Sequence, residues 1–513
     1  MSSPLRPPST PARAGRRPVQ RGGSKTRDVG LAALTGLGLL VAAPPDGVPV
    51  IVFVALVPLC SVVQRRHASW RRAAALGWLA GALFYAGLIP WLPATVARLQ
   101  DVSGAQGIAW SALFIAYHAA QFSLAALALR LAAHDRASVD PHRAWRAAHA
   151  ALLAAGAWIV LEWAYPKVFT WSLGSALGPN RLLRQAADIA GVYGLAAMVV
   201  AVNALLAARC AACAAVATAV LVAMTTYGAH RVAADSGAVA SGPRIGMVQD
   251  GSADGSWQPY AVRSLALAAR SDAIVWPESV LRGYAGDAGD LRDSLTRLAA
   301  RLRRPLVLGA LDHGGEGRER NAVFAFTPQM SAVRYKRQLV PFGEYIPAAN
   351  WLPWLRGWRT TGAFEAGHDG VAPLPFAGSS AALAVCVEAI RPGAFNDQVR
   401  AGAGWLLNLT DDSWFASRRA AAQHLEMARL RAVETHRWLV RVSHSGASAI
   451  FDARGDLVAA LPFGAAGALS HRIAMRRDLT WYVRGGDWPV AAAAVLWAVE
   501  IVRQWARRSR HVE

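Results

Sequence analysis

The sequence has few charged residues for its length. They make up 17% of the 513 positions, whereas hydrophobic residues make up 54% and 20 positions are Trp. This balance argues against a wholly soluble protein and is typical of a chain that exposes much of its surface to lipid. At roughly 150 residues per domain, the length leaves room for two or three structural units.

Cysteine is also scarce. Only four are present, and three of them, Cys60, Cys210 and Cys213, lie inside apolar runs. We therefore expect no disulfide, and we expect Cys210 and Cys213, which have no His or Asp nearby, to pack within a helix rather than bind a metal. Cys386 stands alone in the more polar part of the chain, where a thiol can serve as a nucleophile.

Lysine is rarer than any other charged residue type. Of 54 basic residues only Lys25, Lys167 and Lys336 are Lys. A surface charge can be either Lys or Arg, but a site that needs a compact ammonium group with an adjustable pKa cannot use a guanidinium group. The presence of Lys at position 336, between Tyr335 and Arg337, therefore suggests a functional site that needs an ammonium group.

The formal net charge of +21 raises the possibility of nucleic-acid binding. The distribution of the charge argues against it, because many Arg residues, such as Arg65, Arg66, Arg71 and Arg72, occupy short stretches between apolar runs. Membrane proteins set their orientation in this way. We expect no nucleic-acid partner.

The apolar runs divide the chain into four parts. Residues 1–28 are rich in Pro, Arg, Ser and Gly and predict a disordered, basic, cytoplasmic tail. Residues 29–228 predict seven membrane spans at about 20 residues each, and residues 487–513 an eighth span with a second basic tail. The seven expected spans lie near 29–45, 48–64, 73–93, 106–132, 147–164, 187–208 and 210–228.

Arginine-rich loops should lie in the cytoplasm, which gives an independent test of this topology. The tail, the 65–72 loop, the 133–146 loop and the end of the chain fall on one side, although the 165–186 loop fits less well. An odd number of spans before residue 229 then places residues 229–486 outside the cytoplasm.

The segment 229–486 has a different pattern, in which short apolar runs alternate with stretches of helical period. This pattern predicts an α/β domain. The expected strands are 244–249, 272–276, 305–311, 321–326, 381–387, 404–409 and 448–451, and the expected helices include 258–270, 287–302 and 419–437.

Three reactive groups lie at or just beyond the ends of apolar runs. Ligands bind at strand ends in open α/β folds, so three different strands could converge on one pocket. The three groups are Glu278, Lys336 and Cys386. Together they suit acyl transfer. Cys386 would be the nucleophile, and Glu278 the base for its proton and later for an attacking amine. Lys336 and the backbone N–H of Val387 would stabilise the tetrahedral oxyanion.

The order and context of these residues resemble the nitrilase superfamily, and more closely its membrane-embedded branch, the apolipoprotein N-acyltransferases. The resemblance extends over nearly the whole chain. It includes Glu162-Trp163, the 188–194 and 203–205 stretches, the 408–415 block, Gln423-His424-Leu425, the 431–435 block and Gly446-Ala447-Ser448.

This resemblance implies a nitrilase-like α-β-β-α sandwich on the periplasmic side of a bundle of about eight helices, in the bacterial inner membrane. It implies a ping-pong reaction in which Cys386 takes an acyl chain from a phospholipid and passes it to the N-terminal amine of a diacylglyceryl-cysteine lipoprotein. Glu344 and Glu388 match supporting acidic residues of the family, and each could equally be a buried partner of Lys336 or of a neighbouring Arg. No cofactor and no metal are implied.

Several further residues invite interpretation. The 349–364 stretch, with Trp351, Leu352, Trp354, Leu355 and Trp358, could be an interfacial lid or an ordinary core segment. We expect Asn408, Thr410 and Asp412 to brace the loop beside the nucleophile, Arg431 and Glu434 to form an ion pair on one helix face, and His424 and His444 to be hydrogen-bonded scaffold.

Two rival functions remain open on the sequence. One is a membrane-tethered amidase or nitrilase that hydrolyses a small amide, and the other is a non-catalytic lipoprotein-binding factor that keeps the fold. Val387, where the family commonly has an aromatic residue, leaves the choice of donor and acceptor open.

Overall fold

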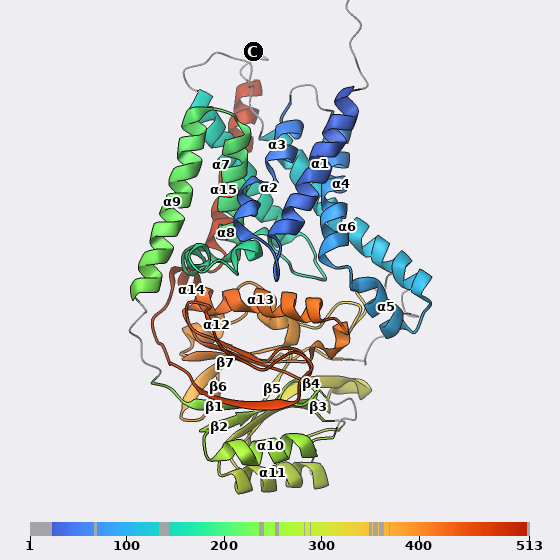
Figure 1. Ribbon diagram of the computed structural model, residues 1–513, viewed down its shortest axis with the longest axis vertical. Coiled ribbons are helices and arrows are strands. Elements are labelled where there is room, and N and C mark those ends of the chain that lie inside the picture. Colours follow the sequence, from blue (N-terminus) through green and yellow to red (C-terminus); the bar gives the residue numbers. More distant parts are fainter. Residues whose placement is uncertain are drawn as a thin grey trace, which may run out of the picture.

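The computed structural model describes residues 23–65, 69–132, 143–234, 241–251, 256–281, 283–287, 289–347, 351, 358, 364–368 and 370–509. A helical bundle forms one end of the molecule and an α/β domain the other (Figure 1). The bundle contains α1 (Gly23–Ala42), α2 (Val52–Ala55), α3 (Val57–Val63), α4 (Trp70–Leu88), α5 (Leu92–Gln100), α6 (Gly104–Leu131), α7 (Arg143–Ala164), α8 (Ala187–Ala207), α9 (Ala211–Ala234) and α15 (Trp488–Ser509).

Four described helices are long and apolar enough to cross a membrane. They are Gly104–Leu131, Ala144–Ala164, Leu183–Ala207 and Ala211–Ala234, and a fifth candidate is the pair α4 and α5, which is bent by 70°. The expected span at 48–64 consists of short helices rather than one continuous helix. Its broken backbone is satisfied by α8, because Asn203 accepts a hydrogen bond from Leu56 N and donates one to Val52 O, each at 2.8 Å.

Two expectations need revision, one for the start of the first helix and one for the cysteines. Helix α1 begins at Gly23, inside the segment expected to be a tail, and its Asp28 pairs with Arg65 and Arg72 at 2.9 and 2.6 Å. The expectation of no disulfide is wrong, because Cys210 and Cys213 are bonded. Cys210 precedes the start of α9, and the first turn brings the two Cα atoms within 5.2 Å.

The α/β domain is built on two sheets of six strands. The first has the order β12-β1-β2-β3-β4-β5 and the second the order β11-β10-β9-β8-β7-β6. The first comprises β1 (Arg244–Gln249), β2 (Ala273–Val275), β3 (Leu306–His313), β4 (Glu319–Phe326), β5 (Met330–Tyr335) and β12 (Gly467–Arg472). The second comprises β6 (Leu374–Phe376), β7 (Ser379–Val385), β8 (Trp405–Thr410), β9 (Leu439–Ser443), β10 (Ala449–Phe451) and β11 (Leu457–Ala460).

Strand alternation gives each sheet two apolar faces. Met247, Val385, Leu407 and Val440 are among the residues that fill the space between the sheets. The outer face of the first sheet packs against α10 (Gln258–Ala268) and α11 (Asp290–Leu302). These four layers agree with the expected α-β-β-α sandwich, and the expected strands and helices of the domain are present within a few residues of their predicted bounds.

The outer face of the second sheet lies against α12 (Asn396–Arg400) and α13 (Arg418–Thr435), and these helices lie between the sheet and the bundle (Figure 1). One continuous apolar core joins Leu406 and Leu439 of the sheet, Met427 and Leu430 of α13, and residues of the bundle such as Val199. The domain is therefore packed onto the bundle rather than tethered by a linker.

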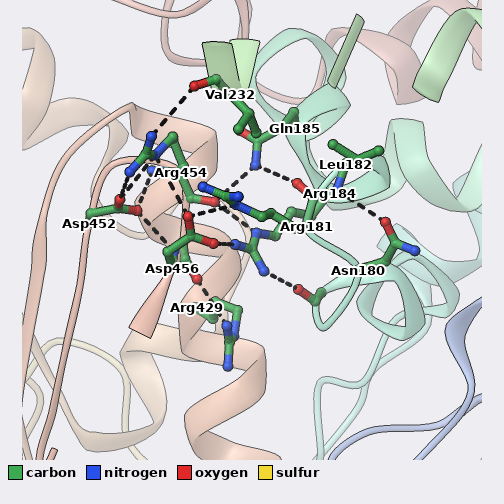
Figure 2. A network of polar contacts seen from close by, with 12 residues as sticks. Asn180, Arg181, Leu182, Arg184, Gln185, Val232, Arg429, Asp452, Arg454 and Asp456 are labelled. Carbon is green, nitrogen blue, oxygen red and sulfur yellow. Dashed lines mark hydrogen bonds and ion pairs between the residues drawn. The ribbon is translucent and has the colours of Figure 1, made fainter. Parts of the chain in front are cut away.

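Polar contacts at one side of this junction are drawn in Figure 2. Arg184, in the short helix Leu183–Ala186 before α8, donates to Arg454 O at 2.7 Å and pairs with Asp456 in the β10–β11 turn. Gln185 donates to the same carbonyl at 3.0 Å, and the more exposed Arg181 pairs with Asp456 at 2.9 Å.

Candidate active site

Cys386 begins a short 3-10 helix, Cys386–Ile390, directly after β7. The expected strand 381–387 therefore ends two residues early, at Val385. Cys386 has a φ of +54°, in the left-handed region that residues with a side chain rarely adopt. A strained residue at such a turn has to be held by its surroundings, and strain of this kind is often found at functional sites.

Glu278 follows β2 of the first sheet and is buried. Its Oε1 accepts hydrogen bonds from Asn321 Nδ2 at 2.7 Å and from Lys336 Nζ at 3.2 Å. Its Oε2 accepts a hydrogen bond from Asp411 N at 2.8 Å. Asp411 directly follows β8 of the second sheet. The carboxylate therefore links the two sheets beside Cys386.

Lys336 follows β5 and is also buried. Besides Glu278, its Nζ contacts Glu344 Oε1 at 2.7 Å. Burial alone would lower the pKa of Lys336, but the charges of Glu278 and Glu344 outweigh burial and raise it well above its usual value. The ammonium group therefore stays charged in this site.

The protonation of the thiol follows from its surroundings. Burial, and then the charge of Glu278, raise the pKa of Cys386 above its ordinary value. Burial also raises the pKa of Glu278, against the lowering effects of Lys336 and of a hydrogen bond with Cys386. The resting thiol is therefore neutral, and Glu278 is a base of raised proton affinity next to it.

The two supporting glutamates have different contacts. Glu344 is a direct partner of Lys336, and its Oε2 accepts from Val340 N at 2.8 Å. Glu388 contacts backbone instead: Oε1 accepts from the N–H groups of residues 337 and 338 at 2.8 and 2.9 Å, and Oε2 accepts from Val385 N at 2.7 Å. Glu388 thereby fixes the segment after Lys336 to the turn of Cys386. Val387 packs against the core shared with the bundle.

Asn408, Thr410 and Asp412 brace the chain beside Cys386, as expected, and Asp412 does so through Thr410, whose hydroxyl lies 3.4 Å from Asp412 Oδ1. Asn408 Nδ2 donates to Ala384 O at 2.9 Å and to Cys386 O at 3.3 Å. In the parallel register Val385 lies opposite Leu409, so Thr410 lies next to Cys386, to which it is hydrogen-bonded. The scaffold roles expected for the two histidines are also confirmed, because His424 Nδ1 lies 2.8 Å from Asp412 and His444 Nδ1 lies 2.6 Å from the Tyr260 hydroxyl.

Two buried residues of this site were not foreseen from the sequence. Asn321 orients Glu278, and Arg441 of β9 holds both Asn408 Oδ1, at 2.5 Å, and Asp412 Oδ2, at 2.8 Å. Burial would raise the pKa of Asp412, but Arg441 and His424 outweigh burial and lower it. The signal in the sequence is weak for both, because Asn321 follows Glu319 and Arg320 at the polar start of β4 and Arg441 is marked only as the one charged residue of β9.

The 349–364 stretch, for which a lid and a core segment were both open, falls largely outside the described residues, including Leu352, Trp354 and Leu355. Of the rest, Trp351 is exposed, and Trp358 donates to Phe342 O at 2.9 Å and stacks edge-on to Trp110 of α6, with 4.8 Å between ring centroids. Within the described part of the chain, no group of three or more His, Cys, Asp or Glu residues could hold a metal ion.

Comparison with known proteins gives matches along most of the chain. The family model for the apolipoprotein N-acyltransferase N-terminal domain matches residues 35–205, and that for carbon-nitrogen hydrolase matches residues 208–477. The second match alone spans more than half of the chain and contains Glu278, Lys336 and Cys386.

Curated relatives carry the same family name. An apolipoprotein N-acyltransferase of Geobacter metallireducens is 29% identical, with 93% of this chain and 96% of the relative covered. One of Gloeobacter violaceus is 28% identical, with coverage of 90% and 91%, and one of Bradyrhizobium diazoefficiens is 32% identical over 56% of this chain and 59% of the relative. The chain therefore belongs to the apolipoprotein N-acyltransferases of the nitrilase, or carbon-nitrogen hydrolase, superfamily.

Proposed function

We propose that this protein transfers an acyl chain from a membrane phospholipid, through a thioester on Cys386, to the N-terminal amine of a diacylglyceryl-cysteine lipoprotein. The observation that carries the proposal is the place of the thiol. Cys386 lies beside a buried carboxylate and a buried ammonium group, in a sheet whose outer helix layer shares one apolar core with the bundle. Lipid-anchored donor and acceptor could both reach such a site.

In the first half-reaction, Cys386 Sγ attacks the ester carbonyl carbon while Glu278 takes the thiol proton. Lys336 Nζ, with the N–H of Val387 as a second donor, stabilises the tetrahedral oxyanion. The carbon–oxygen bond then breaks, and the leaving alkoxide takes the proton from Glu278. The products are a lysophospholipid and an acyl-Cys386 thioester.

In the second half-reaction, the amine of the lipoprotein attacks the thioester carbon and loses a proton to Glu278. The carbon–sulfur bond breaks, and the departing thiolate recovers that proton. The products are an N-acylated lipoprotein and the free thiol. Glu344 would keep Lys336 in place throughout, and Glu388 would hold the turn of Cys386 to the loop of Lys336.

We further propose that the bundle has eight spans in the bacterial inner membrane and that the catalytic domain is periplasmic. The supporting observation is the arrangement in Figure 1, where the start of α1 and the end of α15 lie at the end of the bundle far from the α/β domain. Arg65, Arg72 and the Arg-rich end of α15 belong to that end, as cytoplasmic segments should.

The proposal is tested by intact-mass measurement on the purified full chain incubated with phospholipid. We expect an acyl adduct that hydroxylamine removes and that a diacylglyceryl peptide discharges as a triacylated peptide. Cys386→Ser should form no such thioester. Cys60→Ser provides the matched control, because Cys60 is also a buried cysteine but lies in α3 of the bundle.

Two results would overturn the proposal. Release of free fatty acid without triacylated peptide would indicate a hydrolase that uses water as the acceptor. Absence of any adduct in a single-turnover reaction would indicate a non-catalytic lipoprotein-binding factor.

A further inference from the structure

Helix α13 lies between the second sheet and the bundle (Figure 1). Several of its buried residues are polar or charged. Gln423, His424, Arg431 and Glu434 are all buried. Gln423 and Glu434 are eleven residues apart, which is close to three full turns, so both side chains leave the same face of the helix. Each of them contacts a break in a helix of the bundle.

Gln423 contacts the break between α4 and α5. Its Nε2 donates to Leu88 O at 2.7 Å, and its Oε1 accepts from Trp91 Nε1 at 3.0 Å. Leu88 is the last residue of α4, and the two helices are bent by 70°. A carbonyl group freed by such a break needs a new donor where water is scarce, and Gln423 supplies it.

Glu434 contacts the break in α8. Gly191 interrupts that helix with a φ of +63°, and the ring of Tyr482 lies 2.3 Å from the place a Cβ would occupy, so only Gly fits. The freed N–H of the next residue, Val192, donates to Glu434 Oε1 at 3.0 Å.

The same helix also contacts the turn of the nucleophile. Arg431 donates to Glu434 Oε1 at 2.7 Å and to Ile390 O at 3.2 Å, and Ile390 ends the 3-10 helix that Cys386 begins. His424 holds Asp412, which Arg441 connects to Asn408 and hence to Cys386 O. Polar contacts thus run from the break in α8 through Glu434 and Arg431 to Ile390. The break between α4 and α5 is joined to the other end of the turn through α13 itself, because Gln423 and His424 are adjacent in that helix.

We propose that Gln423 and Glu434 are positioning residues that couple the broken helices α4–α5 and α8 to the turn of Cys386, and so fix the thiol relative to the acyl chain of a bilayer lipid. This role rests on the proposed acyl transfer. A soluble reagent needs no such alignment, so the coupling should matter for a lipid donor and not for a small one. Misplacement of reacting atoms by about 1 Å can cost about a hundredfold in rate.

The test compares Gln423→Leu with the matched control Gln185→Leu. Gln185 is also a buried glutamine that joins the bundle to the domain, through Arg454 O, but it contacts neither a helix break nor the nucleophile (Figure 2). Two rates are measured at Cys386: acyl-adduct formation from phospholipid vesicles and alkylation by iodoacetamide. For Gln423→Leu we expect acylation to fall about ten- to a hundredfold and alkylation to change less than about twofold.

A pair of variants at Glu434 refines the test. Val192 N and Arg431 both donate to Oε1, and among the described residues Oε2 has no hydrogen-bond partner. Glu434→Gln can therefore keep both contacts and should acylate nearly as the unchanged protein does, whereas Glu434→Leu should behave like Gln423→Leu. Amide hydrogen exchange of the 386–390 turn should be faster in the two Leu variants and unchanged in Glu434→Gln and Gln185→Leu.

The proposal is overturned if Gln423→Leu acylates normally, if it loses alkylation as strongly as acylation, or if Gln185→Leu is equally impaired. Unchanged exchange of the 386–390 turn in both Leu variants would also overturn it. If the unchanged protein forms no adduct from phospholipid, the proposed function fails, whereas the exchange experiment still decides whether the coupling exists.

Discussion

Helices α11 and α13 occupy equivalent layers of the sandwich, yet their surroundings are opposite. Helix α11 covers the first sheet with one apolar face, on which Leu295, Leu298, Ala299 and Leu302 are buried, and presents its charged residues to solvent. Helix α13 is buried on both sides, and its buried residues include Gln423, His424, Arg431 and Glu434. The layer of α13 is thus an interface with the bundle, and it contains buried polar side chains.

The outer helix layer of a sandwich can contain buried polar groups where it packs against a membrane bundle. A buried polar group costs free energy unless it is paired, so an outer layer that only covers a sheet gains nothing from such groups. In α13 they are paired with the broken helices of the bundle and with the turn of Cys386. Substitutions in the active site, in α13 and in α11 should therefore differ in size and in kind.

The largest effect should come from Lys336→Met, in the site between the two sheets. The substitution leaves Glu278 and Glu344 buried without their common partner, which should cost about 3–5 kcal/mol of unfolding free energy. Loss of the oxyanion donor should also lower the acylation rate by at least about a hundredfold. Thermal unfolding in detergent and the adduct assay measure the two effects. A variant that stays active would exclude Lys336 from the chemistry.

The next prediction compares the loss of one arginine from α13 with the loss of one from α11. Arg431→Met leaves Glu434 without its charged partner and removes the donor of Ile390 O, which should cost about 3–5 kcal/mol at pH 8, where Glu434 is charged. Arg297 of α11, an exposed residue that bonds only Ser294 among the described residues, should tolerate Arg297→Met within about 0.5 kcal/mol. Equal costs, measured by denaturation of both variants, would remove the distinction between the two layers.

The pH dependence of stability should separate the layers further. Burial raises the pKa of Glu434 from the usual 4.5 to about 7, against the lowering effect of Arg431 and with a further rise from Asp487, to which Tyr482 is hydrogen-bonded. Between pH 4.5 and about pH 7, Glu434 is therefore protonated in the folded state and ionised in the unfolded state. Stability from this group is therefore full below pH 4.5 and is lost as pH rises to about 7, a change of about 3 kcal/mol.

Glu434→Gln should remove this dependence. Melting temperatures of the variant and the unchanged protein are compared between pH 4.5 and 8, and the unchanged protein should lose stability relative to the variant as pH rises. Parallel curves would show that Glu434 keeps an ordinary pKa and is not buried as the structure has it.

Local features of this molecule could be predicted from the sequence. Glu278, Lys336 and Cys386 follow apolar runs and converge because strand ends share one edge of a sandwich. The ion pair of Arg431 and Glu434 follows from their spacing of three on a helix, and the structure confirms it at 2.7 Å.

Long-range features could not be predicted in this way. The bond between Gln423 and Leu88 joins residues 335 positions apart, and no local pattern marks it. Arg441 is one charge in an apolar strand, and its role depends on Asn408 and Asp412, which only the folded sheet brings to it. The apolar run at 48–64 likewise gives no sign that it is divided into short helices, or that Asn203, about 150 positions away, contacts its backbone.

The smallest effect should come from the edge of the junction between the domain and the bundle, where Arg181 and Arg184 both pair with Asp456 (Figure 2). The two arginines differ in solvent exposure, and we expect their contributions to stability to differ accordingly. The side chain of Arg181 is 53% exposed and that of Arg184 only 2%. Solvent and salt screen the first pair, so Arg181→Ala should cost less than about 1 kcal/mol, and 1 M salt should abolish even that. Arg184→Met also removes the bond to Arg454 O and should cost more at any salt concentration. If denaturation shows equal and salt-independent costs, the junction is held by both residues alike, and burial does not explain which contacts join the domain to the bundle.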